Sequence, residues 1–348
     1  RRWICWRKDE IRMGFFLKVY TMDFLKAIFV FMLLLDILSC NKQEEVVPPP
    51  GNDYRQAMRE LVIGISEYTK AIHADFTVIP QNGIELVSTN GEEAGPPHTA
   101  YLEAIDGNGQ EDLFYGYTKD DKATPANENE YLISFLNISK NAGKTILVTD
   151  YCSTQSKMDD SYSRNSANQY VSFAADRREL NDIPDYPPTI HSENANGITS
   201  LSEAKNFLYL INPDQFATKA DFNQAVTATN YDLIVMDLFF QDGVAFTSSE
   251  INQLKSKANG GKRMVICYMS IGEAEDYRYY WQPEWNAHKP SWMNAENPNW
   301  AGNYKVQYWN AEWQAILYGN DNSYIKKIVD AGFDGVYLDI IDAFEYYE

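Results

Sequence analysis

The sequence predicts an α/β protein, most specifically a single (β/α)8 barrel. Two observations predict it. From residue 54 onward, short apolar segments alternate with amphipathic helical patterns, and eight such segments can be counted. Several of them are followed at once by polar residues, as at the carboxyl ends of parallel strands. Alternating strands and helices favour a parallel sheet, and the length from residue 54 to residue 348 suits one barrel.

The elements follow one another regularly along the chain. The first helix places Met58, Leu61, Val62 and Ile65 on one face, at helical spacing, and leads into the strand Phe76–Pro80. The other predicted strands are Leu113–Gly116, Thr145–Asp150, Tyr170–Ala174, Phe207–Ile211, Leu233–Asp237, Met264–Met269 and Gly335–Asp339. Helix starts are expected at Thr218 and at the capping box that begins with Thr247. The polar stretch 184–199 is interpreted as a long loop, with a domain linker as the alternative.

The first 53 residues are expected to lie outside the barrel. The run Ala27–Leu38 is mostly apolar but too short to span a bilayer, and Ile37–Cys40 resembles a bacterial lipobox with Cys40 as the lipidated residue. Residues 1–40 are therefore interpreted as a spurious extension plus a lipoprotein signal peptide, and residues 41–53 as an acidic, proline-rich tether. This predicts a protein lipid-anchored in the outer membrane or at the surface of a Gram-negative bacterium, with no other membrane attachment.

Charge and cysteine content exclude several classes of function. The net charge of −19 disfavours nucleic acid and favours cationic partners. The four cysteines and four histidines are scattered, so neither a disulfide framework nor a metal site is expected. No phosphate-binding loop, dinucleotide fingerprint or nucleophile elbow is present, and no cofactor is predicted. We expect a monomer.

Polar residues at the ends of several predicted strands are the candidate site. Asp339 ends the last strand, and the segment from Tyr268 to Trp281 is rich in carboxylates and aromatic residues. The other candidates occur at or near further strands, and the complete predicted set is Asp339, Glu111, Asp237, Tyr268, Glu273, Arg278, Asn82, Asp150 and Trp281. Any single one could be a helix cap or a solvated side chain, but their repetition at strand ends indicates a site.

Paired carboxylates near exposed aromatic residues favour glycoside hydrolysis. That reaction needs one protonated carboxyl group that donates to the leaving oxygen. A second, ionised one attacks the sugar or activates water. The tryptophans between residues 281 and 313 could stack on sugar rings or pack in the core.

Two segments resemble the signature segments of glycoside hydrolase family 114. They are Tyr268–Trp281 (YMSIGEAEDYRYYW) and Gly332–Asp339 (GFDGVYLD). Family members are endo-α-1,4-polygalactosaminidases on (β/α)8 barrels, and relatives have carried a cysteinyl-tRNA-synthetase-related label. The HIGH and KMSKS motifs of a synthetase are absent here. The resemblance implies hydrolysis of an α-1,4-linked, cationic galactosamine polymer.

The resemblance also implies a circular permutation. The segments Phe76–Gly83 and Ile105–Gly116 resemble parts that follow the Gly332–Asp339 strand in the family, yet here they precede it. We therefore expect the strand ending at Asp339 to pair with Phe76–Pro80, and the helix over residues 55–70 to take the place after it. By resemblance Asp339 would be the nucleophile and Glu111 the general acid/base, with Asp112 the alternative to Glu111.

Two other interpretations stay open. A surface lipoprotein could bind a glycan without cleaving it. Alternatively, an unrelated N-terminal domain could precede half a barrel, although residues 203–348 contain only four predicted strands and would leave sheet edges open.

Overall fold

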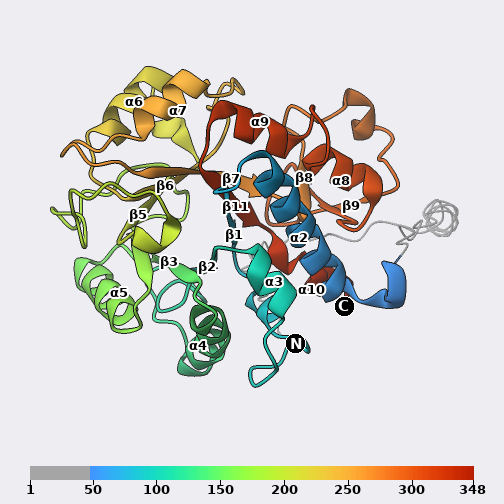
Figure 1. Ribbon diagram of the computed structural model, residues 1–348, viewed down its shortest axis with the longest axis horizontal. Helices are drawn as coiled ribbons and strands as arrows, with labels where there is room; N and C mark the ends of the chain where they lie inside the picture. Colours follow the sequence, from blue (N-terminus) through green and yellow to red (C-terminus); the bar gives the residue numbers. More distant parts are fainter. Residues whose placement is uncertain (1–47) are drawn as a thin grey trace, which may run out of the picture. The chain divides into compact units, whose positions relative to one another are not determined.

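The computed structural model describes residues 48–348. The predicted signal peptide, Cys40 and most of the predicted tether lie outside the described residues. The described part is mixed α/β, with parallel strands at the centre and helices around them (Figure 1). None of its helices is long and apolar enough to cross a lipid bilayer.

The helices begin where the sequence placed caps. Thr247 forms a capping box with Glu250, and the Thr218 side chain accepts a hydrogen bond from the Asp221 N–H. Both predicted starts are confirmed. The helices are α2 (Tyr54–Ile72), α3 (Thr99–Ala104), α4 (Ala126–Asn141), α5 (Gln155–Ala167), α6 (Lys219–Thr227), α7 (Ser248–Leu254), α8 (Ala311–Leu317), α9 (Tyr324–Ala331) and α10 (Phe344–Tyr347).

The parallel strands form two sheets. One sheet has the order β1-β11-β7-β6-β5 and the other has the order β2-β3-β4. Every pairing within these two sheets is parallel. The strands are β1 (Thr77–Pro80), β2 (Gly107–Glu111), β3 (Thr145–Tyr151), β4 (Val171–Ala175), β5 (Phe207–Tyr209), β6 (Leu233–Met236), β7 (Met264–Ser270) and β11 (Gly335–Asp339).

One predicted strand was wrong. The apolar run Leu113–Gly116 is not a strand, and the second strand is instead β2, just before it. The residues of β2 are polar or glycine (GNGQE), so an apolar pattern could not reveal them. They form a strand because β3 pairs with them along the full length of β2. Glu111 is consequently the last residue of a strand, rather than a residue that precedes one.

The two sheets touch at both pairs of edge strands. Gln81, which follows β1, forms a parallel bridge with Gly109 of β2, and the Asn82 N–H donates to the Gly109 carbonyl at 2.9 Å. At the other edges, β4 and β5 lie side by side, with the rings of Phe173 and Phe207 5.8 Å apart. The stretch 184–199 contains no helix or strand, as predicted for a loop, and the rest of the connection from β4 to β5 holds one short 3-10 helix, Leu201–Glu203.

The predicted pairing of the strand that ends at Asp339 with Phe76–Pro80 is confirmed. β11 pairs in parallel with β1, with Thr77 opposite Gly335 and Pro80 opposite Leu338. Helix α2 packs against α9, α10 and α3, beside this pair of strands (Figure 1). The Arg55 guanidinium and the Glu348 carboxylate form an ion pair at 3.0 Å, so the start of α2 lies next to the last residue of the chain.

An antiparallel sheet interrupts the connection after β7. It has the order β8-β10-β9, from β8 (Glu273–Glu275), β9 (Met293–Glu296) and β10 (Asn303–Val306). Strand β9 lies within the segment 283–300, although its Pro, Asn and Gly residues favour a loop. The ring of Trp292 is buried here against Trp285 and Trp313, so core packing explains part of the tryptophan cluster.

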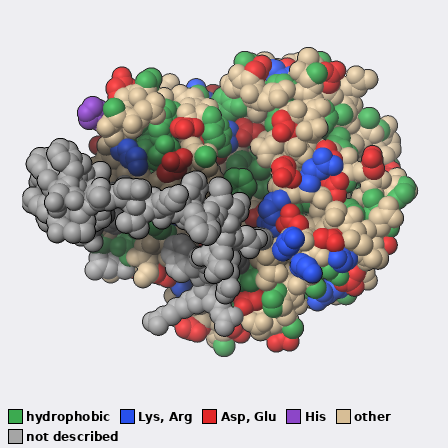
Figure 2. Space-filling view, turned by 180° about the vertical axis from the view of Figure 1, so that it is seen from behind, with side chains coloured by type: hydrophobic (Ala, Val, Ile, Leu, Met, Phe, Trp, Pro, Cys, Tyr) green, Lys and Arg blue, Asp and Glu red, His purple; other side chains and the backbone are tan. Residues whose placement is uncertain are grey.

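Negative charge does not cover the surface uniformly. In the view of Figure 2, acidic and basic side chains are interspersed where described atoms are visible, and several Lys and Arg side chains gather near the middle. Attraction of a cationic ligand therefore depends on local groups of carboxylates more than on a uniform field.

Candidate active site

Asp339 and Glu111 lie at the ends of the two strands that flank β1. Asp339 ends β11 and Glu111 ends β2, with β1 between them. Gln81 fixes the register of the three strands. It forms a bridge with Gly109 of β2, and its N–H donates to the Leu338 carbonyl of β11. Because side chains two residues apart share a face, Glu111 lies on the same face as Gly109 and just beyond it. The sheet topology thus brings two distant carboxylates together.

The surroundings of Asp339 favour a protonated carboxyl group. Its Oδ2 accepts a hydrogen bond from the Tyr268 hydroxyl at 2.6 Å. Burial and the nearby charge of Glu111 raise the pKa of Asp339 to about 8, against the lowering effects of Tyr268 and of the Ile340 N–H. Near neutral pH, this carboxyl group therefore holds a proton.

Glu111 is held through both carboxylate oxygens. Asn82 Nδ2 donates to Oε2 at 3.1 Å, and Asn82 Oδ1 accepts from the Glu111 backbone N–H at 3.0 Å. The Tyr151 hydroxyl donates a short hydrogen bond to Oε1. Tyr151 was not among the predicted site residues, although the sequence placed it directly after Asp150 at a strand tip. The position of Tyr151 at a strand tip could be recognised from the sequence, whereas its hydrogen bond to Glu111 could not.

Asp237 and Arg278 form a buried ion-pair network. The Arg278 guanidinium lies 2.7 Å from Asp237 Oδ2 and 2.6 Å from Glu275 Oε2. Burial raises the pKa of Asp237, and the charge of Arg278 opposes that rise. Glu275 was missed in the sequence because three carboxylates follow β7 within six residues, and the pattern does not distinguish among them. The Tyr277 hydroxyl donates to Glu275, yet 61% of this residue stays exposed.

Comparison with known proteins gives a family match over part of the chain. The model of glycoside-hydrolase family GH114 matches residues 187–347. Over these residues the chain is similar to family GH114. The matched part contains Asp339, Asp237, Tyr268 and Arg278, whereas Glu111, Asn82 and Tyr151 come from the part before it.

Three relatives in other organisms are similar over shorter stretches. An uncharacterized protein of Methanocaldococcus jannaschii is 41% identical over 157 residues, which are 44% of this chain and 42% of that protein. An uncharacterized protein of Thermotoga maritima is 37% identical over 122 residues, 35% of this chain and 36% of the relative. One of Deinococcus radiodurans is 39% identical over 124 residues, 36% of this chain and 37% of the relative. The chain thus matches less than half the length of these relatives.

Three further predicted site residues, Asp150, Glu273 and Trp281, make structural contacts. The buried Asp150 carboxylate accepts bonds from the N–H groups of Phe114 and Tyr115 and from two side chains of α5. It therefore fixes the loop that follows Glu111. Glu273 accepts from Asn297 at 2.8 Å. Trp281 packs against Trp285 and Tyr304 and donates to Asn286. These contacts tie Glu273 and Trp281 to the inserted antiparallel sheet.

A layer of tyrosines lies beneath the carboxylate pair. The Tyr337 hydroxyl occupies the space that a Cβ of residue 109 would fill, so this position of β2 must be glycine. The Tyr209 ring contacts Tyr337 edge-on and its hydroxyl donates to Gln81 at 2.7 Å. Burial raises the pKa of both tyrosines well above its ordinary value, so both hydroxyls stay protonated under the site.

Further carboxylates lie beside the pair. Burial and the charges of Glu345 and Glu85 raise the pKa of Asp342 to about 7, and Glu111 adds to this rise. Asp342 follows β11, and Glu85 lies in the turn after β1. This side of the site is therefore locally acidic. No group of three or more His, Cys, Asp or Glu side chains in residues 48–348 is arranged to hold a metal ion.

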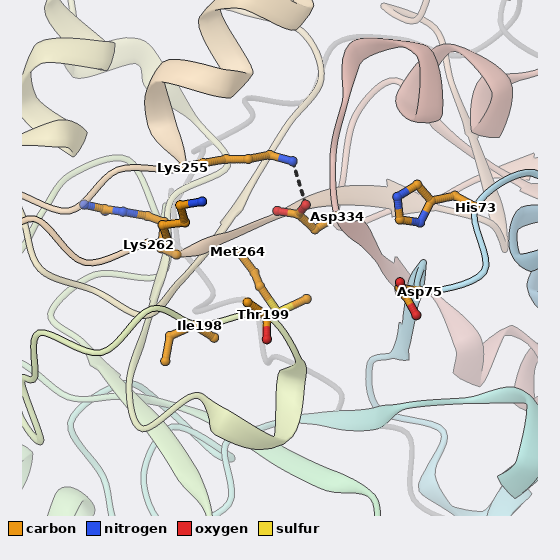
Figure 3. A pocket seen from close by; sticks show the side chains of 9 residues that line it. His73, Asp75, Ile198, Thr199, Lys255, Lys262, Met264 and Asp334 are labelled. Carbon is orange, nitrogen blue, oxygen red and sulfur yellow. Dashed lines mark hydrogen bonds and ion pairs between the residues drawn. The ribbon is translucent and has the colours of Figure 1, made fainter.

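A hollow at the opposite strand ends contains none of the predicted site residues. It has a volume of about 240 Å³ and lies where β1, β7 and β11 begin (Figure 3). The Asp334 carboxylate there accepts from Lys255 at 2.6 Å and from the Val265 N–H at 2.8 Å. Those bonds join β11 to β7, so this end of the strands has a stabilising role.

Proposed function

We propose that this chain is a glycoside hydrolase that cleaves α-1,4-linked galactosamine-type polysaccharide, with Asp339 and Glu111 as its paired acids. The observation that carries the proposal is the position of these two carboxyl groups at the ends of β11 and β2, on either side of β1, where the charge of Glu111 acts on Asp339. The match of residues 187–347 to the model of family GH114 supports the reaction class.

The proposed architecture is a closed (β/α)8 barrel with permuted order. Its strands would follow the circle β1-β2-β3-β4-β5-β6-β7-β11, in chain order. Support comes from the contacts between β1 and β2 and between β4 and β5, which join the two parallel sheets. Helix α2 would occupy the position after β11, because it packs between α9 and α3. The seam between the chain ends would then lie beside Asp339.

Catalysis needs one proton on the pair, and the raised pKa of Asp339 supplies that condition. In the proposed mechanism Asp339 attacks the sugar and Glu111 protonates the leaving oxygen, as the family resemblance implies. The proton must therefore move from Asp339 to Glu111 when substrate binds. A protonated amino sugar near Asp339 would favour its ionised form, and the carboxylates Asp342, Glu345 and Glu85 would add to the attraction.

The test is cleavage of partly deacetylated galactosaminogalactan, with products identified by mass spectrometry. Asp339→Asn and Glu111→Gln should each lower kcat by about 10²–10⁴-fold. Asp330→Asn is the control, since Asp330 is exposed on α9 and pairs with Lys326. A folded wild-type protein that leaves this polymer intact would rule out the proposed substrate.

Binding without cleavage would instead favour the non-catalytic alternative. A surface glycan-binding lipoprotein would bind the polymer with equal affinity before and after Asp339→Asn, and the wild type would release no product. Isothermal titration calorimetry on both proteins separates the two functions.

The proposed location is the bacterial outer membrane or cell surface, with a lipid on Cys40. The lipobox-like segment supports it. Radiolabelled palmitate should label the wild type and not Cys40→Ala, and the variant should leave the membrane fraction. Equal labelling of both would exclude Cys40 as the acylated residue.

A further inference from the structure

Arg178 forms several hydrogen bonds to the loop that follows Glu111. It follows β4 by three residues. Its guanidinium donates to Asp112 Oδ1 at 2.8 Å and to Oδ2 at 3.3 Å. It also donates to Asp120 at 2.8 Å and to the Gly116 carbonyl at 3.2 Å. One side chain thus joins the loop after β4 to the loop after β2.

Arg178 occupies both carboxylate oxygens of Asp112. Such a two-pronged pair fixes a carboxylate in direction as well as in position. Asp112 also has a left-handed backbone, with φ of 58°, and a side chain on residue 116 would overlap its carboxylate. The conformation turns this carboxylate toward Arg178. Glu111, one residue earlier, is left to meet Asp339.

The same guanidinium lies on the ring of Tyr151. Its central carbon is 3.9 Å from the ring centre, within the range of a cation–π contact. Tyr151 ends β3 and its hydroxyl donates to Glu111. Burial raises the pKa of Tyr151 well above its ordinary value, so the hydroxyl keeps its proton and acts as the donor. Arg178 therefore fixes the ring whose hydroxyl holds Glu111.

We propose that Arg178 is a positioning residue for Glu111: it withdraws Asp112 from the site and stacks on Tyr151, whose hydroxyl aims the Glu111 carboxylate. The proposal rests on the proposed function, because it takes Glu111 to be one of the two reacting acids. It assigns the second acid to Glu111 and excludes Asp112.

Conservative variants test this role. Arg178→Lys keeps the charge but loses the two-pronged hydrogen bonding to Asp112 and the flat surface that stacks on Tyr151. Tyr151→Phe loses only the hydroxyl. Each should lower kcat by about 10–100-fold, as is usual for groups that orient an active-site ligand, with KM changed less than about twofold. Arg177→Lys is the matched control, because Arg177 pairs with Asp176 and Asp182 at the surface and should keep wild-type kinetics.

The double variant separates positioning from mere loop stability. If Arg178 acts through Tyr151, the kcat of Arg178→Lys/Tyr151→Phe should equal that of Tyr151→Phe. If the losses in kcat of the two single variants multiply in the double variant, Arg178 does not act through Tyr151, and this result would overturn the proposal. So would an Arg178→Lys protein that melts earlier with unchanged kcat. Asp112→Asn should also retain at least about tenfold more activity than Glu111→Gln, and the reverse order would overturn the assignment of Glu111.

A crystal structure of Arg178→Lys gives a result that does not depend on turnover. We expect the Tyr151 hydroxyl to leave hydrogen-bonding distance of Glu111, with the Asp112 carboxylate turned. An unchanged Tyr151–Glu111 bond would overturn the proposal. A wild type that cleaves no polymer would refute the proposed function alone, and the crystal structure would still decide whether Arg178 positions Glu111.

Discussion

Asp339 has a raised pKa that should be measurable as a dependence of stability on pH. Its pKa is about 8 in the folded protein against an ordinary value of 3.8. Between these values the folded state binds more protons than the unfolded state. Stability from this residue is therefore complete near pH 4, falls as the pH rises toward 8, and is constant above that.

Asp339→Asn should abolish the loss of stability that the wild type shows as the pH rises toward 8. We expect the variant to melt at least about 2 °C above the wild type at about pH 8, with a much smaller difference at about pH 5. Thermal unfolding followed by circular dichroism measures it, and Asp330→Asn is the exposed control. A wild type and variant that differ equally at both pH values would contradict the raised pKa.

Tyr277 is the residue best placed to contact a sugar ring. It is 61% exposed, while its hydroxyl is held by the buried Glu275, so the ring is both accessible and fixed. It also lies close enough to Tyr268 to affect the pKa of that residue. Tyr277→Ala should raise KM by about 2–10-fold with kcat retained, whereas Tyr277→Phe should match the wild type. An unchanged KM in the alanine variant would exclude stacking.

Sequence reasoning found residues with a local signal and missed those defined by long-range contacts. Asp339 and Asn82 follow apolar strands, so a pattern of strand plus polar tip indicated them. Arg178 is only a basic residue in a loop until Asp112, 66 positions earlier, is placed beside it. The role of Tyr151 likewise becomes visible only when Glu111, 40 positions earlier, is placed beside its hydroxyl. Their roles depend on which strands become neighbours, and no local periodicity contains that information.

At the scale of elements, β2 shows what an apolar pattern cannot predict. Most predicted strands were found within a few residues of their observed positions. By contrast, Gly107–Glu111 lacks any apolar run. Its conformation comes from backbone bonds to β3 and from the need for a glycine under the Tyr337 hydroxyl. The family resemblance over Ile105–Gly116 covered this segment, while the hydrophobic pattern placed the strand six residues too late.

Gly109→Ala should therefore destabilise the protein. The new methyl group would overlap the Tyr337 hydroxyl and the ring behind it, and the surrounding strands leave little room to shift. We expect a loss of about 1–3 kcal/mol in the free energy of unfolding, measured by urea denaturation. Gly197→Ala is the control, because its Cβ would meet only Lys262 Cβ at 4.0 Å. Equal stability of the two variants would show that Tyr337 is free to move.

At the scale of the whole molecule, the family match and the strand pairing give different boundaries. Residues 187–347 match family GH114, yet they contain only β5, β6, β7 and β11 of the eight parallel strands. In the structure β11 pairs with β1, and β5 lies beside β4. Cutting before residue 187 would expose both edge strands and would separate Asp339 from Glu111.

A fragment of residues 187–348 should accordingly aggregate when expressed alone, because its two edge strands lose their neighbours. Co-expression with residues 48–186 should restore a soluble complex, since the second fragment supplies β1 to the edge of β11 and β4 to the edge of β5. Size-exclusion chromatography measures assembly, and cleavage of the galactosamine polymer measures recovery of the site. A soluble, monomeric fragment 187–348 that unfolds cooperatively would contradict the closed barrel, and would show that the segment matching the family folds without the strands that complete its proposed active site.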